Sequence, residues 1–110
     1  MTESNKLNYN PQGLIPAIIQ DINTGTVLML GYMNPETIRM TLEKGEAVFW
    51  SRSRQEVWHK GATSGNYLKV KEIYKDCENN SLLIKAEPMG PTCHTGNVHC
   101  FFTEFKEEDI

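Results

Sequence analysis

The stretch VLMLGYMNPETIRMTLEKGEAVFWSRSR, residues 27–54, contains the signals that decide the fold. Its opening apolar run is typical of a strand, and we expect residues 26–33 to form one. The Asn-Pro pair at residues 34–35 marks the start of a helix, because asparagine caps a helix and proline suits its first position. Gly45 is a typical helix end. Residues 46–51 then predict a second strand, so this stretch indicates a strand-helix-strand unit.

The rest of the chain predicts more strands around this unit. Ile38 and Leu42, four residues apart, predict the helix face that packs against the core. A polar turn at residues 21–25 joins two apolar runs and predicts a hairpin. Besides residues 26–33 and 46–51, we expect strands over residues 14–20, 67–75, 81–87 and 98–105. The sequence therefore predicts a small α+β domain, mostly of antiparallel strands, with one clear helix.

Length and charge limit the kind of protein. The 110 residues allow a single domain over residues 1–110, with polar residues 1–13 expected as a loosely held N-terminal arm. Eleven basic against 14 acidic residues give a net charge of −3, which disfavours nucleic acid as a partner. No apolar run approaches the ~20 residues of a membrane span, and the polar N-terminus shows no signal peptide. We therefore expect a cytoplasmic protein with no membrane partner.

Three cysteines, an odd number, disfavour a self-contained disulfide framework. Cys77, Cys93 and Cys100, together with His94, offer the sulfur and nitrogen donors that zinc prefers. Three protein ligands with an open fourth position suit catalysis, because zinc then lowers the pKa of a bound water to about 7. The alternative is three buried apolar cysteines, and their spacing alone does not decide between the two.

Oxygen ligands alternate around Cys77, at Asp76, Glu78 and Asn80. Two carboxylates and a carboxamide can hold magnesium, usually through water. Aspartate and asparagine are also common in turns after strands, and on these residues alone a plain turn is the favoured interpretation.

Two loops are rich in basic and hydroxyl side chains. The first contains Ser51, Arg52, Ser53 and Arg54, and the second contains Lys60, Thr63, Ser64 and Gly65. Arginine binds phosphate through two parallel hydrogen bonds, and backbone amides flanked by glycine can surround an anion. Since the chain is otherwise acidic, these loops favour a small phosphorylated ligand over a polymer. The alternative is a solvated basic surface.

Four stretches together resemble the phosphoribosyl-AMP cyclohydrolase family: residues 27–54, WHKGATSGN at 58–66, DCENN at 76–80 and GPTCHTGNVHCFF at 90–102. The resemblance implies a hydrolase of histidine biosynthesis that opens the purine ring of N1-(5-phosphoribosyl)-AMP at the N1–C6 bond. The product would be the phosphoribosyl-formimino-carboxamide ribotide. The resemblance also implies zinc, magnesium and a homodimer whose zinc sites draw ligands from both chains.

The family's zinc cysteines fall on Cys77, Cys93 and Cys100, and its candidate proton-transfer histidine falls on His94. Its magnesium motif, Asp-Cys-Asp-x-Asp, aligns with residues 76–80, where Glu78 and Asn80 depart from it. His99 receives no role. The chain has no extension long enough for the pyrophosphohydrolase domain of some relatives, which implies the monofunctional form. Two alternatives remain: a zinc-stabilised binding module, and a nucleotide sensor that has lost turnover.

Overall fold

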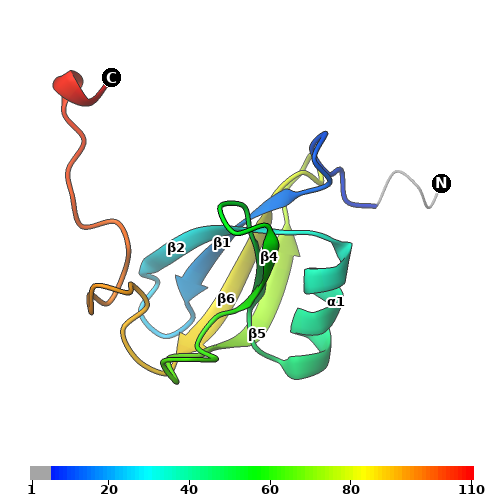
Figure 1. Ribbon diagram of the computed structural model, residues 1–110, viewed down its shortest axis with the longest axis horizontal. Coiled ribbons are helices and arrows are strands. Elements are labelled where there is room, and N and C mark those ends of the chain that lie inside the picture. The colour runs from blue at the N-terminus through cyan, green and yellow to red at the C-terminus, as the bar shows by residue number, and fades with distance from the viewer. Residues whose placement is uncertain (1–5) are drawn as a thin grey trace.

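Six strands and one α-helix make up the fold of residues 6–110, which the computed structural model describes (Figure 1). In chain order the elements are β1 (Ile15–Asp21), β2 (Val27–Met33), α1 (Pro35–Lys44), β3 (Val48–Ser51), β4 (Glu56–His59), β5 (Leu68–Lys75), β6 (Leu82–Pro88) and the 3₁₀ helix η2 (Glu107–Asp109). Four strands form a sheet in the order β2-β1-β6-β5, and β3 pairs with β4 in a separate hairpin. The predicted α+β class with one clear helix is confirmed.

Strand pairing in the large sheet is mostly antiparallel. β1 pairs with β2 and β5 with β6 in antiparallel fashion, whereas β1 and β6 run parallel. Every second residue of the two central strands is buried, as expected for a sheet with one covered face. These residues are Ile15, Ala17 and Ile19 of β1, and Leu82, Ile84 and Ala86 of β6.

Helix α1 begins and ends where the sequence predicts. The Asn34 side chain accepts a hydrogen bond from the Thr37 N–H, and the Thr37 hydroxyl accepts one from the Asn34 N–H. Gly45 has a φ of 71°, a left-handed conformation that glycine adopts without strain. The expected buried face is wrong in part, because Leu42 is 67% exposed while Thr37 and Thr41 are buried.

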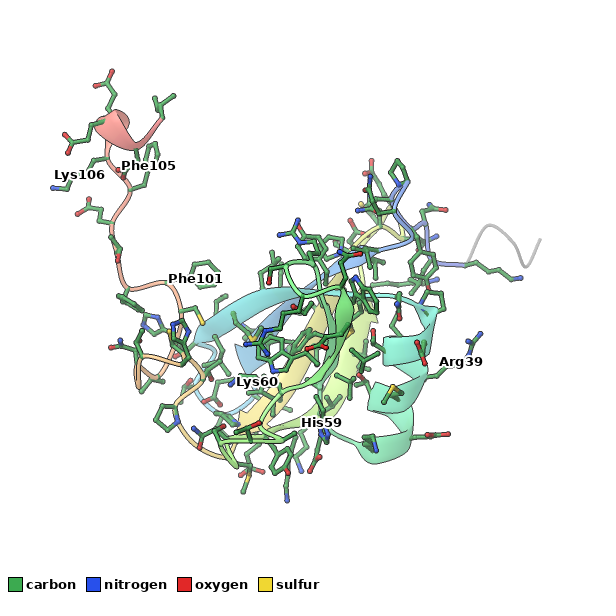
Figure 2. The ribbon with its side chains drawn as sticks, viewed as in Figure 1. Arg39, His59, Lys60, Phe101, Phe105 and Lys106 are labelled. Carbon is green, nitrogen blue, oxygen red and sulfur yellow. The ribbon has the colours of Figure 1, made fainter. Side chains whose placement is uncertain are left out.

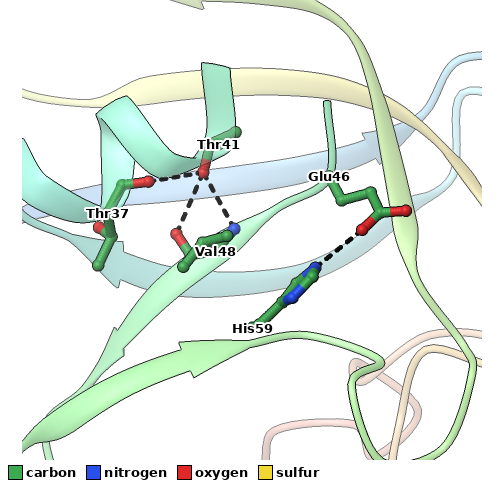
Figure 3. Close-up of polar contacts among 5 residues, drawn as sticks. All are labelled: Thr37, Thr41, Glu46, Val48 and His59. Carbon is green, nitrogen blue, oxygen red and sulfur yellow. Dashed lines mark hydrogen bonds and ion pairs between the residues drawn. The ribbon is translucent and has the colours of Figure 1, made fainter. Parts of the chain in front are cut away.

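Thr41 is buried because its hydroxyl joins the helix to β3. It donates a hydrogen bond to the Thr37 carbonyl at 2.8 Å and accepts one from the Val48 N–H at 3.0 Å (Figure 3). Val48 is buried, and no strand lies on the helix side of β3 to accept a hydrogen bond from its N–H. The Thr41 hydroxyl is the acceptor in place of a strand carbonyl. Apolar periodicity cannot predict such a polar contact.

Gly31 of β2 lets the β3–β4 hairpin approach the sheet closely. A Cβ at this position would lie 2.6 Å from Cδ1 of the buried Phe49 in β3. Only glycine leaves room for the ring, which explains a glycine inside a strand. The hairpin is therefore fixed beside β2. Its position determines where the loops at the two ends of β4 lie.

Three expectations about the chain ends and loops need correction. Residues 98–105 form no strand: after Cys100 donates its N–H to the Leu28 carbonyl, the chain leaves the body as an extended arm (Figure 1). Apolar alternation predicted a strand there, but among the described residues this one hydrogen bond to β2 is not continued into a ladder. Strand β4 was not expected, because only four residues of a polar segment form it.

The N-terminal arm is attached along the part that the structure describes. Leu7 and Tyr9 pack against the core, and the Asn8 N–H donates to the Asn79 carbonyl at 2.7 Å. The prediction of a loose arm is therefore wrong for these residues, and residues 1–5 lie outside the described part. Neither of the described helices is long and apolar enough to cross a membrane.

We predict that Thr41→Val lowers the free energy of unfolding by about 1–3 kcal/mol, because it leaves the buried Val48 N–H without an acceptor at nearly constant volume. Urea denaturation of the two proteins measures the difference. Thr103→Val, on the exposed arm, is the matched control and should change the value by less than about 0.5 kcal/mol. Equal stabilities for Thr41→Val and native protein would show that the hydroxyl does not hold β3.

Candidate active site

A pocket of about 600 Å³ gathers residues from three parts of the chain. Strand β4 forms its floor, residues 60–66 form one wall, and residues 91–96 form the other. Of the predicted site residues, those that line it are Arg54, Lys60, Thr63, Ser64, Cys93 and His94. The structure thus brings the second basic loop together with the loop that contains the cysteine and histidine.

Short backbone hydrogen bonds shape the wall formed by residues 60–66. The Ala62 N–H donates to the His59 carbonyl, and the Gly65 N–H donates to the Gly61 carbonyl at 2.7 Å. Gly61 has a φ of 94°, and a Cβ there would lie 2.5 Å from the Tyr67 nitrogen. Glycine is therefore required where this loop turns back on β5.

Lys60 is almost completely buried, with 7% of its surface exposed. Burial lowers the pKa of its amine, while the negative charges of Cys100 and Cys93 oppose this and raise it. No carboxylate forms an ion pair with it among the described residues. The sequence predicted a phosphate contact, and the Lys60 amine (labelled in Figure 2) also lies close enough to the thiols of Cys100 and Cys93 for their charges to act on it.

Cys93 and Cys100 interact with one another and differ in acidity. A hydrogen bond from the Thr95 hydroxyl, 3.1 Å from Sγ, lowers the pKa of the Cys93 thiol. Burial and the neighbouring Cys93 charge raise the pKa of the Cys100 thiol. Cys93 is therefore the first of the pair to become a thiolate, the form that binds metals.

Cys77 does not lie with the other two cysteines. It is exposed in the turn after β5, whereas Cys93 follows β6, and the seven residues of β6 separate the two ends by about 20 Å. Within residues 6–110 no three His, Cys, Asp or Glu side chains are grouped so that they could hold a metal. One chain thus brings together two of the three predicted zinc ligands, and these are donors of the kind that zinc prefers.

The two histidines near the cysteines have different settings. His94 is exposed at the pocket, directly after Cys93. His99 accepts a hydrogen bond from the Phe101 N–H through Nδ1. Of these two histidines, only His94 lines the pocket.

The predicted magnesium residues form a tight turn. The Asp76 carboxylate accepts hydrogen bonds from the backbone N–H groups of Asn80, at 2.9 Å, and Ser81. Partial desolvation opposes ionisation of Asp76, but these bonds and one from Glu78 outweigh it and lower its pKa. The turn is also tied to the N-terminal arm, since the Asn8 amide donates to the Glu78 carbonyl.

The first basic loop lies at the other end of β4 from the second. Its backbone is a turn in which the Gln55 N–H donates to the Ser51 carbonyl at 2.8 Å. Arg54 reaches the main pocket and lies 4.0 Å from Glu56. Ser51, Arg52 and Ser53 line a second pocket of about 440 Å³. Trp58 lines both pockets and is the residue where they meet.

Sequence reasoning gave no role to His59 and Asn66, which also line the main pocket. His59 Nε2 lies 2.9 Å from a carboxylate oxygen of Glu46 (Figure 3), and its ring contacts Tyr67 at a centroid distance of 5.2 Å. Asn66 fills the space beside Gly90, where a Cβ would collide with it. The position of His59 directly before Lys60 was the only available signal for it.

Comparisons with known proteins show the family of the chain. The family model described as phosphoribosyl-AMP cyclohydrolase matches residues 29–102. A phosphoribosyl-AMP cyclohydrolase of Clostridium botulinum is 54% identical over 101 residues, which cover 91% of this chain and 92% of that protein. One from Trichormus variabilis is 56% identical over 98 residues, or 88% of this chain and 84% of that protein.

A relative from Caldanaerobacter subterraneus subsp. tengcongensis is a histidine biosynthesis bifunctional protein, 56% identical over 108 residues. The match covers 98% of this chain and 53% of that protein, so the chain spans about half the length of this bifunctional relative. The family model covers most of β2, all of β3 to β6, both basic loops and the Cys93–Cys100 pair. On these grounds the chain belongs to the phosphoribosyl-AMP cyclohydrolase family.

Proposed function

We propose that this chain hydrolyses the N1–C6 bond of the purine ring in N1-(5-phosphoribosyl)-AMP, a step of histidine biosynthesis. The observation that carries the proposal is the main pocket, where Cys93 and His94 face hydroxyl and basic groups suited to phosphate. Membership of the family supports the same substrate. A binding module or a nucleotide sensor would need the phosphate contacts but not a histidine beside a thiol pair.

The shape of the site suits a substrate with a phosphate at each end. The two basic loops lie at opposite ends of β4, whose four residues add about 13 Å of extended strand between them. Trp58, 40% exposed, lies between them and offers its ring to a purine. Thr63 and Ser64 lie at one end and Arg52 at the other, so we assign the two phosphates to these two places.

The reaction needs an electrophilic C6, a water molecule and a proton at N1. Ribosylation of N1 makes the ring cationic, which itself activates C6. Breaking the N1–C6 bond leaves N1 as an amidine nitrogen that must gain a proton, and we assign its delivery to His94, which lines the pocket. A zinc ion bound beside it would supply acidified water for attack on C6.

We further propose that zinc is held by Cys93 and Cys100 of one chain and by Cys77 of a second copy. Two thiols already meet in each chain, and the third lies at the far end of β6. A homodimer also explains the arm, which exposes Phe101 and Phe105 away from the body (Figure 2). Exposed aromatics of this kind favour burial against another protein surface.

Magnesium is proposed at the turn of residues 76–80. The carboxylates of Asp76 and Glu78 would supply the negative charge there for a cation that keeps most of its water. The reducing cytoplasm, where we expect the protein, would keep the three cysteines as thiols, and all three are free.

Turnover is tested by ultraviolet absorbance. With zinc and magnesium added, the native protein should change the spectrum of N1-(5-phosphoribosyl)-AMP as the ring opens. We expect His94→Asn to lower kcat by about a hundredfold to ten-thousandfold with zinc content unchanged, because proton delivery is lost. His99→Asn is the matched control and should retain kcat. Equal rates for His94→Asn and native protein would remove the histidine from the reaction.

The shared zinc site is tested by mixing two inactive variants. Cys77→Ala and Cys93→Ala should each lose zinc and turnover. Unfolded and refolded together, they should recover about a quarter of native activity, because half of the dimers are mixed and each has one intact site. No recovery, in a mixture that size-exclusion chromatography shows to be dimeric, would mean that each site is built within one chain.

Magnesium binding is tested with Asp76→Asn, which keeps an acceptor oxygen for the turn and removes the charge. We expect the magnesium concentration for half-maximal rate to rise by about tenfold or more. Thermal unfolding of both proteins without magnesium is the control for the turn. An unchanged magnesium dependence would place the cation elsewhere.

A further inference from the structure

The two arginines of the first basic loop differ in their electrostatic partners. Arg54 lies 4.0 Å from the Glu56 carboxylate, which offsets part of its charge. Arg52 has no carboxylate partner within residues 6–110. Its guanidinium instead lies over the ring of Tyr32, with Cζ 3.9 Å from the ring centroid. Arg52 therefore has a defined position without a carboxylate that would compete with an anion for it.

We propose that Tyr32 is a positioning residue that holds the Arg52 guanidinium for one 5-phosphate of the substrate. This inference rests on the proposed function and adds a residue to which no role had been assigned. It also assigns the two arginines different roles. Arg52 binds the phosphate directly, and Arg54 contributes less to phosphate binding because the Glu56 carboxylate competes for its guanidinium. The contact of Arg52 with an aromatic face is the observation that carries the proposal.

Contacts fix both the backbone and the guanidinium of Arg52. Its carbonyl accepts a hydrogen bond from the Gln55 amide at 2.7 Å, which fixes the turn. Its guanidinium lies well within the ~6 Å range in which a cation is attracted to an aromatic face. Tyr32 belongs to β2 and pairs there with Pro16 of β1, so the ring has a rigid base. An exposed arginine without these contacts would lose conformational entropy on binding an anion.

Stacking leaves the edges of the guanidinium free. The N–H groups lie in its plane, so a ring that covers one face does not compete with a phosphate for them. Ser51 and Ser53 line the same pocket as Tyr32 and Arg52, and their hydroxyl oxygens are 3.5 Å apart. Trp58 connects this pocket with the main one. A phosphate held here therefore lies at the end of the proposed substrate site.

Lysine cannot replace this arginine, because an ammonium group has neither the planar face nor the paired N–H groups. Arg52→Lys should therefore raise KM nearly as much as Arg52→Ala. Tyr32→Leu keeps an apolar side chain but removes the ring, and we expect it to raise KM by about threefold to tenfold with little change in kcat. Tyr32→Phe keeps the ring and should restore KM to within about twofold of the native value.

A double-mutant cycle separates positioning from general damage. In the Arg52→Ala background, Tyr32→Leu should raise KM by less than about twofold, since the arginine that it positions is gone. A purely structural role for Tyr32 would instead lower kcat per total protein and leave KM unchanged. The proposal is overturned if Tyr32→Leu leaves KM unchanged, if phenylalanine fails to restore it, or if the two substitutions act independently.

Calorimetry with ribose 5-phosphate makes the test independent of turnover. The native protein should bind it about threefold to tenfold more tightly than Tyr32→Leu does, with Tyr32→Phe close to native. If the native protein shows no ring opening but this difference persists, the proposed function fails and the role of Tyr32 stands. Equal binding by the variants, or no binding by the native protein, overturns the role of Tyr32.

Discussion

The attachment of the β3–β4 hairpin to the large sheet is the constraint on which the candidate site depends. The Thr41 hydroxyl fixes one edge of β3 to the helix, and Phe49 packs into the space that Gly31 leaves on β2. Both basic loops are extensions of this hairpin, one at each end of β4. A shift of the hairpin would therefore move both proposed phosphate sites relative to Cys93 and His94, which belong to a separate loop. The hydrogen bond of Thr41 and the absence of a side chain at Gly31 thus determine the dimensions of the candidate site.

The second feature is that one chain brings together only two of the three proposed zinc ligands. Cys93 and Cys100 interact closely, with Lys60 buried beside them, whereas Cys77 lies at the far end of β6. The extended arm after Cys100 exposes aromatic side chains that a lone domain would be expected to bury. Both observations are explained if two copies exchange contacts, so that the thiol of one completes the site of the other. Assembly would then be part of the chemistry, because no site would be complete without it.

Much of the fold follows from local signals, and the departures have physical causes. The helix ends at residues 34 and 45 were predictable because caps are short-range chemistry, and the β1–β2 hairpin because a polar turn separates two apolar runs. The buried helix face was not, since Thr41 is buried to satisfy the Val48 N–H, a contact with the following strand β3 that apolar periodicity does not reveal. The strand expected over residues 98–105 does not form: alternation shows only that a segment can pair, and among the described residues the segment makes a single backbone hydrogen bond to the edge strand β2, from the Cys100 N–H to the Leu28 carbonyl.

In the candidate site, too, local sequence signals predicted the residue types, whereas tertiary packing decides which residues meet. The residue types of the two basic loops and of the Cys93–His94 pair indicated their chemistry, and the structure gathers six of the predicted residues in one pocket. Which loops meet, and that Tyr32 supports Arg52, depends on tertiary packing. The central claim is that water attacks C6 and that the N1–C6 bond breaks. Mass spectrometry of the product formed in heavy-oxygen water tests it most directly: we predict substrate plus one labelled water, with both ribose phosphates retained. A labelled product that has lost ammonia, or recovery of unchanged substrate, would contradict it.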